Sequence, residues 1–379
     1  MNILIVNNNM EIGGIQKSLV NLLSQISADH NVTLMLFSAH GDLMDDIPQN
    51  VTVKTGNAFT KILGMSQSMA KSSGVFPFLW RSLWAVFSKI FGVKVPFWVL
   101  SRLQKDKSEY DVAISFMQNS HYNYFYGGTG EYVLNSVSAK KKIAFVHCDF
   151  ENYFGNNSYN IGMYRNFDKI ACVSHSVKAV FDRVCPQYAD KTCTVHNMYD
   201  FGYMEKLAGE NVALSDIHPI IFSSSRVSRE KGILRMIPIF ASMKELPFIW
   251  YIAGEGEDLS SAIELTKKYG LSDKIIFLGQ KKNPYPYFRQ ADFVLVPSFN
   301  EAAPMVFAEA FTFATPVFTT DTTSAKELVA DISGGWVATE ENLCDELYRV
   351  IKDELYREVV PKYDASNKIA IEEFENMIK

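Results

Sequence analysis

The stretch that says most about this protein is Ser298-Phe-Asn-Glu301-Ala-Ala-Pro304-Met-Val-Phe-Ala-Glu309-Ala-Phe-Thr-Phe-Ala314-Thr-Pro316. The apolar run 293–297 precedes it and predicts a buried strand. Pro304 suits the first turn of a helix. Apolar residues then recur at helical spacing and predict one buried stripe, at 307, 310, 311 and 314. A strand followed by a loop and a helix is typical of open α/β sheets, which bind ligands where their strands end.

Two glutamates flank the start of this predicted helix. Glu301 lies in the loop before it, and Glu309 lies on the side opposite the apolar stripe. Backbone N–H groups at a helix N-terminus attract phosphate. Carboxylates would repel phosphate, so we interpret both glutamates as acceptors of hydrogen bonds from sugar hydroxyls. The alternative is a solvated helix face, because two glutamates at this spacing occur on many helices.

The stretch resembles the E-x7-E signature of the family-4 retaining glycosyltransferases, which have the GT-B fold. The strand, the Pro297-Ser298 pair, both glutamates and the Pro316-Val pair all match, and Ala314 replaces the usual glycine. The resemblance implies that Glu309 holds the ribose hydroxyls and Glu301 the donor sugar. It also implies that the start of the helix binds the donor, through Ala303, Pro304, Met305 and Val306.

Length and composition set limits on the protein class. A chain of 379 residues with 47% hydrophobic residues should form two domains with full cores. The formal charge of -5 gives no case for nucleic acid as a partner. The five cysteines form no metal-binding spacing and suggest a reduced, cytoplasmic protein. The N-terminus resembles a first strand and not a signal peptide, and no apolar run is long enough to span a membrane.

The first residues predict a strand, a glycine-rich turn and a helix. The strand covers 2–7, and Gly13 and Gly14 precede a helix with apolar residues on one face. This arrangement can bind phosphate. It lacks the G-x-G-x-x-G pattern, which argues against a dinucleotide site and an oxidoreductase. The resemblance places both glycines against the donor diphosphate and the acceptor, and the alternative is a plain tight turn.

A histidine follows another predicted strand. His147 comes directly after the apolar run 142–146, at the kind of position where open sheets carry their sites. The resembled family places a histidine near the donor diphosphate and the reacting sugar. Its role would be hydrogen bonding or charge neutralisation. A purely structural histidine is the alternative.

Residues 61–107 differ in character from the rest of the chain. They hold eight basic residues and one acidic residue, with aromatic residues between them. Trp80, Trp84, Phe87 and Phe91 share a helical face, which suits a helix lying in a membrane interface. We expect Pro77 and Pro96 to break the segment into pieces. The alternative is a set of ordinary helices packed on the first domain.

The second half contains a pair of cations beside a predicted helix. Arg226 and Lys231 lie five residues apart at a turn between a strand and a helix, where they add charged donors to an anion site. They resemble the family's Arg-x4-Lys pair, which holds the donor diphosphate. Gly254 lies in a tight turn after the strand 248–253, and the resemblance places Gln280 beside the nucleotide base. An exposed charge cluster is the alternative.

Strands and helices alternate in both halves, which predicts an α/β protein of two doubly wound, Rossmann-like domains facing a cleft. We expect an acceptor-side domain from 1–200, with 362–379 crossing back to it. We expect the nucleotide sugar to bind to 201–361. Oligomeric state stays open.

The resemblance implies a retaining, metal-independent hexosyltransferase without a cofactor. Its donor would be a nucleotide sugar, uridine-linked, and its acceptor a lipid-linked glycan or another glycoconjugate in surface polysaccharide synthesis. It would work at the inner face of the membrane, bound peripherally through 61–107. His147, Arg226, Lys231 and Glu301 would be its catalytic residues, and no metal ligands are expected. The alternatives are a nucleotide-sugar epimerase or hydrolase on the same fold and a non-catalytic nucleotide-sugar-binding protein.

Overall fold

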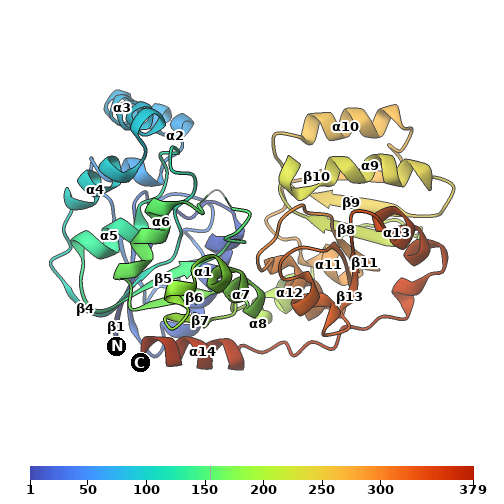
Figure 1. Cartoon of the computed structure of the whole chain (residues 1–379). Helices are drawn as coiled ribbons and strands as arrows, with labels where there is room; N and C mark the ends of the chain where they lie inside the picture. Colours follow the sequence, from blue (N-terminus) through green and yellow to red (C-terminus); the bar gives the residue numbers. More distant parts are fainter. Residues whose placement is uncertain (154) are drawn as a thin grey trace. The chain divides into compact units, whose positions relative to one another are not determined.

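The computed structural model describes residues 1–153 and 155–379 and divides them into two compact units (Figure 1). Unit 1 contains residues 1–199 and 367–379, and unit 2 contains residues 200–366. The boundaries expected from the sequence, 200/201 and 361/362, lie one and five residues away from these. Each unit has its own parallel sheet.

Unit 1 is built on a sheet of seven described strands in the order β3-β2-β1-β4-β5-β6-β7. The strands run parallel, as in the pairing of Ile3 with Val32 on one side and with Val112 on the other. Their bounds are β1 (Asn2–Asn7), β2 (Asn31–Leu36), β3 (Thr52–Thr55), β4 (Glu109–Ser115), β5 (Ser138–Val146), β6 (Lys169–Cys172) and β7 (Thr192–Thr194). Continuous apolar runs produce the central strands, because a parallel sheet is covered on both faces.

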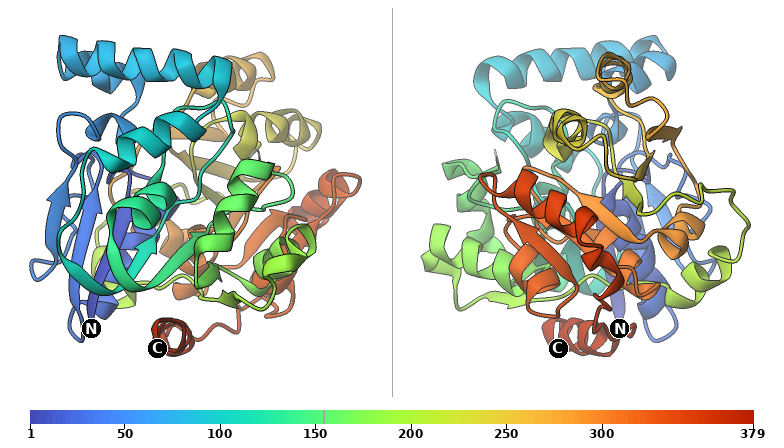
Figure 2. Two further views of the ribbon diagram at one scale, coloured as in Figure 1. Left: turned by 60° about the vertical axis from the view of Figure 1, so that its left-hand side comes forward. Right: turned by 90° about the vertical axis from the view of Figure 1, so that its right-hand side faces the viewer.

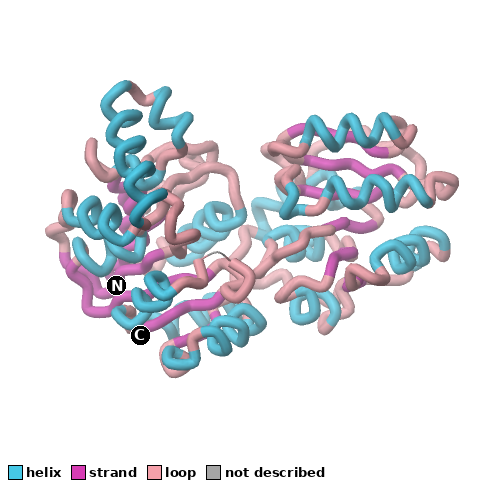
Figure 3. Tube along the Cα trace, turned by 45° about the horizontal axis from the view of Figure 1, so that its top comes forward, coloured by secondary structure: helices cyan, strands magenta, loops and turns pink. Residues whose placement is uncertain are grey.

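Helices cover this sheet on both faces (Figure 3). The first, α1 (Gly14–Ile26), buries Leu19, Leu22, Leu23 and Ile26. The others are α2 (Gln67–Ser72), α3 (Val75–Phe91), α4 (Lys94–Arg102), α5 (Thr129–Ser136), α6 (Ser158–Met163) and α7 (His175–Val184). The last helix of the chain, α14 (Lys368–Ile378), belongs to unit 1 and buries Phe374, Met377 and Ile378 against it.

The segment 61–107 differs from the prediction in where it breaks. Pro77 and Pro96 are each the third residue of a helix, in the first turn where proline costs no hydrogen bond, so they break nothing. The breaks fall instead at Gly74 and Gly92, whose φ values of +120° and +84° bound α3. In the part of the chain that the structure describes, no helix is both long and apolar enough to cross a bilayer.

The exposed face of α3 also differs from the predicted one. Of the predicted aromatic face, Trp80, Trp84 and Phe87 are half-buried and only Phe91 is exposed, and Phe59 packs edge-on against Trp80. Solvent instead meets an aliphatic stripe formed by Val75, Leu79, Leu83, Val86 and Ile90. The helix itself lies at the periphery of unit 1 (Figure 2). We call these five residues the α3 stripe.

Unit 2 is built on a parallel sheet of six described strands in the order β10-β9-β8-β11-β12-β13. Their bounds are β8 (Ile220–Ser224), β9 (Ile249–Ala253), β10 (Ile275–Gly279), β11 (Phe293–Val296), β12 (Val317–Thr320) and β13 (Gly335–Ala338). One core lies between the sheet and α9 (Ile233–Ser242), α10 (Leu259–Lys268) and α13 (Leu343–Lys352). A second core lies on the other face, with α11 (Tyr285–Gln290) and α12 (Met305–Thr312). The remaining helix, α8 (Phe201–Leu207), opens the unit.

Candidate functional site

The loops after β8 and β9 are bonded to each other at the carboxyl ends of their strands. The N–H of Ser225 donates to the Ala253 carbonyl at 3.1 Å, and the N–H of Val227 donates to the Glu255 carbonyl at 2.8 Å. Gly254 allows this approach, because a Cβ there would lie 1.8 Å from the Ser225 carbonyl oxygen. The loop that carries Arg226 and Lys231 is therefore fixed by its backbone, at the edge of the sheet where ligands bind.

Lys231 and Glu301 form an ion pair at the centre of this edge. The Lys231 Nζ lies 2.6 Å from Oε1 of Glu301, and the side chains are only 19% and 11% exposed. The hydroxyl of Ser298 donates to the same carboxylate oxygen at 2.7 Å. Charge-assisted hydrogen bonds of this kind orient both partners. The pair presents a cation and a carboxylate side by side, which can meet a phosphate oxygen and a sugar hydroxyl of one ligand.

A latch between the β8 and β11 loops holds the pair in place. Nε of Arg235 donates to the Pro297 carbonyl at 3.0 Å, and its guanidinium lies 3.8 Å from the centroid of the Phe299 ring. The N–H of Phe299 donates to the Glu230 carbonyl at 2.9 Å. Gly232 permits this close approach to Pro297, because a Cβ at position 232 would lie 2.0 Å from the Pro297 carbonyl oxygen. Its φ of +69° also favours glycine.

We expect Gly232→Ala to lower the midpoint of thermal unfolding more than Gly270→Ala does. Both glycines have a φ of +69°. A side chain in this left-handed region therefore lowers the free energy of unfolding by the same amount in both variants, about 1–2 kcal/mol. At Gly270 no atom lies within 4 Å of the new Cβ, whereas at Gly232 it meets the Pro297 carbonyl. Circular dichroism of the two variants, heated side by side, makes the comparison. Equal midpoints would contradict a tight latch.

Glu309 does not lie on an exposed side of its helix. It is 4% exposed, and every residue of α12 from Met305 to Phe311 is buried. The alternative of a solvated helix face is therefore wrong for Glu309, because neighbouring segments also cover the side of α12 opposite the apolar residues. A carboxylate in such surroundings needs hydrogen-bond partners, and Glu309 has interactions within the fold.

The start of α12 faces the Glu301 loop with its backbone. Pro304 is the cap residue, one position before the helix, and provides no side-chain cap. Ala303 and Pro304 are half-buried, whereas Met305 and Val306 are buried. The N–H groups of a first turn are donors that an anion can use. Backbone atoms, and not the side chains of these four residues, are therefore what the position offers to a ligand.

Arg226 is separate from the Lys231–Glu301 pair. Its guanidinium lies 3.7 Å from the Glu230 carboxylate, and the two side chains are 68% and 55% exposed. An exposed pair of this kind contributes at most about 1 kcal/mol, so Arg226 can turn toward a ligand at little cost. Gln280 is exposed directly after β10, and the Gly279 carbonyl next to it accepts from the Gly254 N–H at 2.9 Å.

Gly13 and Gly14 begin α1 in unit 1 without a local need for glycine. Gly13 is the cap residue with a φ of −170°, and no atom lies within 4 Å of a Cβ on Gly14. A Cβ on Gly13 would meet only the flexible end of Gln16. Neither packing nor backbone strain explains why both positions are glycine. The backbone at Gly13 and Gly14 is open to the close approach of a ligand.

His147 is an uncharged residue at neutral pH. Its ring lies between Phe116 and Phe145, with centroid distances of 4.7 and 5.6 Å. Burial lowers the pKa of His147 to about 3, although a hydrogen bond with the Phe116 backbone opposes the shift. The ring is therefore neutral in the protein without a bound donor, which favours the predicted role of hydrogen bonding over that of charge neutralisation. Among the described residues, Nε2 of His147 has no hydrogen-bond partner.

Two residues that shape this site are absent from the sequence predictions. Ser298 lies within the most informative stretch, but a serine there looks like a turn residue until its bond to Glu301 is seen. Arg235 bonds a backbone carbonyl 62 positions away, which no local pattern reveals.

Comparison with known proteins finds similarity to sugar transferases over part of the chain. Residues 210–366, which contain Arg226, Lys231, Glu301 and Glu309, match the family model described as glycosyl transferases group 1. The chain is 30% identical over 155 residues to the N-acetylgalactosamine-N,N'-diacetylbacillosaminyl-diphospho-undecaprenol 4-alpha-N-acetylgalactosaminyltransferase of Campylobacter jejuni. It is 23% identical over 209 residues to the N-acetyl-alpha-D-glucosaminyl L-malate synthase of Bacillus anthracis. These matches cover 40% and 52% of this chain, and 41% and 54% of the relatives.

Solved structures resemble the whole chain. HepE of Anabaena in complex with UDP-glucose superposes with a TM-score of 0.65 at 17% identity, over 100% of this chain and 97% of that one. The lipopolysaccharide outer core galactosyltransferase WaaB gives 0.62 at 15% identity, over 100% and 99%. Identities this low show the fold alone. The expected fold class of two parallel-sheet α/β domains of GT-B type is confirmed.

Proposed function

We propose that this chain, whose residues 210–366 belong to the group 1 glycosyl transferases, moves a sugar from a nucleotide-sugar donor to a glycoconjugate acceptor in surface polysaccharide synthesis. The donor is uridine-linked, the acceptor is a lipid-linked glycan, and the anomeric configuration is retained. The protein works at the cytoplasmic face of a membrane. The observation that carries the proposal is the Lys231–Glu301 pair, latched at the carboxyl edge of the unit 2 sheet.

The arrangement of Lys231 and Glu301 suits the bond that breaks in such a transfer, which joins the sugar to the diphosphate. In a nucleotide sugar, the hydroxyls of the sugar lie a few ångströms from the oxygens of the leaving diphosphate. A cation and a carboxylate 2.6 Å apart match that junction. On donor binding, Lys231 exchanges Glu301 for a phosphate oxygen, and Glu301 accepts from a sugar hydroxyl. Negative charge develops on the diphosphate as it leaves, and a preorganised cation stabilises it. Arg226 and the N–H groups at the start of α12 add further donors.

Two comparisons support the substrate classes. The HepE structure contains UDP-glucose, which favours a uridine-linked donor for a chain of the same fold. The name of the Campylobacter relative describes an acceptor linked to undecaprenol through a diphosphate, which favours a lipid-linked acceptor.

A screen of nucleotide sugars tests the proposal directly. The purified chain is incubated with each donor, with and without extracted membrane lipids, and nucleoside diphosphate release is followed together with the sugar products. A transferase releases diphosphate only when acceptor is present. Product from the donor alone would instead support an epimerase or hydrolase. Binding of donors without any turnover would support a non-catalytic binding protein.

The α3 stripe supports binding to a membrane surface. Its five side chains are between 58% and 75% exposed, follow helical spacing, and have basic residues near both ends of the helix, such as Lys71 and Lys89. An amphipathic helix of this kind lies in the headgroup region and gains from anionic lipid. Arg81 is not one of the basic residues that could meet anionic lipid, because its side chain is buried and donates to the Met65 and Phe125 carbonyls.

We expect the double variant Leu83→Asp, Ile90→Asp to lose binding to vesicles that contain anionic lipid, while the unaltered protein floats with them at low salt. Two carboxylates in the α3 stripe both remove apolar contact and repel the anionic surface. Val360→Asp is the matched control, since Val360 is 67% exposed in unit 2. Equal flotation of the double variant and the control would contradict docking through α3.

We expect transfer to continue in excess EDTA. Lys231 and Arg226 provide the positive charge that a divalent ion would otherwise supply at the diphosphate. Initial rates are compared with and without the chelator. A loss of rate that Mg²⁺ restores would contradict a metal-independent transfer.

A further inference from the structure

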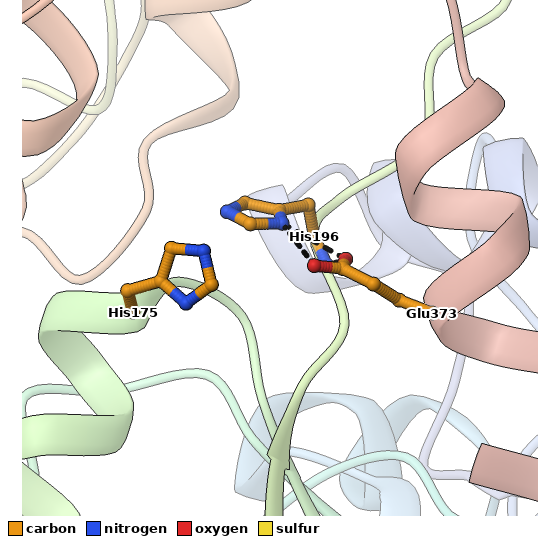
Figure 4. Close-up of side chains that lie close together, drawn as sticks. All are labelled: His175, His196 and Glu373. Atoms are coloured by element: carbon orange, nitrogen blue, oxygen red, sulfur yellow. Dashed lines mark hydrogen bonds and ion pairs between the residues drawn. The ribbon is translucent and has the colours of Figure 1, made fainter. Parts of the chain in front are cut away.

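Three metal-ligating side chains meet in unit 1, outside the groups assigned to sugar transfer. His175 is the first residue of α7, His196 follows β7, and Glu373 comes from α14. One ligand atom from each lies within 4.8 Å of the other two. Figure 4 shows the two imidazole rings and the carboxylate turned toward one another. We call these three residues the His-His-Glu cluster.

Neighbouring groups orient the ligands of the His-His-Glu cluster. The Thr194 hydroxyl lies 3.0 Å from Nδ1 of His175, which leaves Nε2 of that ring as its ligand nitrogen. The backbone N–H of His196 donates to Oε2 of Glu373 at 3.0 Å, and this fixes the carboxylate. Such outer contacts are typical of metal-binding histidines, because they select the tautomer and aim the second nitrogen.

We propose that the His-His-Glu cluster binds a divalent transition metal, with Zn²⁺ as the ion that fits best. Two imidazole nitrogens and one carboxylate oxygen are a ligand set that zinc accepts, with water as the fourth ligand. Ligands about 2.0–2.1 Å from a tetrahedral ion lie roughly 3.4 Å apart. The cluster must therefore close by about 1.4 Å at most, and His175 is the ligand with the most exposed side chain.

The bound ion would fasten the C-terminal helix to unit 1. The three ligands come from segments up to 198 positions apart, at 175, 196 and 373. Without a metal, α14 is held by its buried apolar face and by two histidine–glutamate pairs. These are His196 with Glu373 at 2.9 Å and His30 with Glu375 at 2.7 Å. Among the residues that the structure describes, only the first pair has a second histidine beside it, so the second pair provides an internal comparison.

The experiment compares metal binding by four versions of the full-length, chelator-treated protein. Zn²⁺ is titrated in competition with a chromogenic chelator, and Co²⁺ absorption reports the coordination geometry. We expect the unaltered protein to bind one equivalent, and His175→Ala and Glu373→Gln to bind at least tenfold more weakly. His30→Ala should bind like the unaltered protein, although it also removes a pair on α14. Equal affinity of the unaltered protein and His175→Ala would overturn the proposal.

Thermal unfolding gives a second readout that does not depend on enzyme activity. A ligand that binds only the folded state raises the unfolding midpoint as its concentration rises. Zn²⁺ should therefore raise the midpoint of the unaltered protein and of His30→Ala, and raise that of His175→Ala much less at the same concentration. If His175→Ala fails to fold, Glu373→Gln carries the comparison. A rise of the same size in every variant would show binding at other surface groups and overturn the proposal.

Discussion

Lys231→Ala should lower sugar transfer by a factor of a hundred or more, with a larger effect on turnover than on donor affinity. The ammonium group contacts Glu301 in the structure, and in the proposed transfer it moves to the diphosphate as charge develops there. Removing a preorganised donor from a developing oxyanion costs about 2.7–4 kcal/mol, which corresponds to this factor. Initial rates at several donor concentrations separate kcat from KM and measure the effect.

Arg229→Ala is the matched control for Lys231→Ala. Arg229 lies two positions earlier on the same short turn and is exposed, so its loss removes one positive charge without touching the pair. Its transfer rate should stay close to normal. A circular dichroism check is needed for Lys231→Ala, because the variant leaves Glu301 partly buried without its cation. Near-normal turnover of a folded Lys231→Ala variant would remove Lys231 from the mechanism.

The central strands could be predicted from sequence because they are short, continuous apolar runs. The run 2–7 and the run 293–297 become β1 and β11 with almost the same bounds. The edge strand β3 has the sequence Thr-Val-Lys-Thr and is mostly exposed, so it carries no apolar signal. Its place in the sheet depends on pairing with β2, which is a tertiary property.

On α3 and α12 the structure adds what the helical pattern alone does not contain. A helical pattern shows which residues share a face, but it does not show which face a neighbour covers. Phe59 and its surroundings cover the tryptophan side of α3, so the aliphatic side is left to solvent. For α12, coverage on all sides buries Glu309.

The ion pair at the centre of the site illustrates the same limit. Lys231 and Glu301 were each predicted as donor-binding residues, but from separate motifs 70 positions apart. Their contact depends on the latch between the β8 and β11 loops, which is built from Gly232, Arg235 and backbone carbonyls. These roles are set by three-dimensional packing and leave no repeated pattern in the chain.

The contact between Lys231 and Glu301 predicts that their substitutions are not independent. Glu301→Gln keeps the shape of the side chain and removes its charge, so it weakens the hydrogen bonds to Lys231, to Ser298 and to the donor sugar. Hydrogen bonds to charged groups are worth about 1.5–3 kcal/mol. We therefore expect transfer to fall roughly 10- to 150-fold, as measured by kcat/KM for the donor.

The double variant decides how the two residues act. If they hold one sugar–phosphate junction together, Lys231→Ala with Glu301→Gln should lose much less than the product of the two single losses, because each single change already disrupts the shared contact. Arg229→Ala with Glu301→Gln is the control and should be multiplicative. Ser298→Ala should cost only a few-fold, since it removes one of two bonds to the carboxylate oxygen. Multiplicative losses in the Lys231 and Glu301 cycle would mean that the cation and the carboxylate serve separate parts of the ligand. The ion pair would then be a feature of the free protein alone.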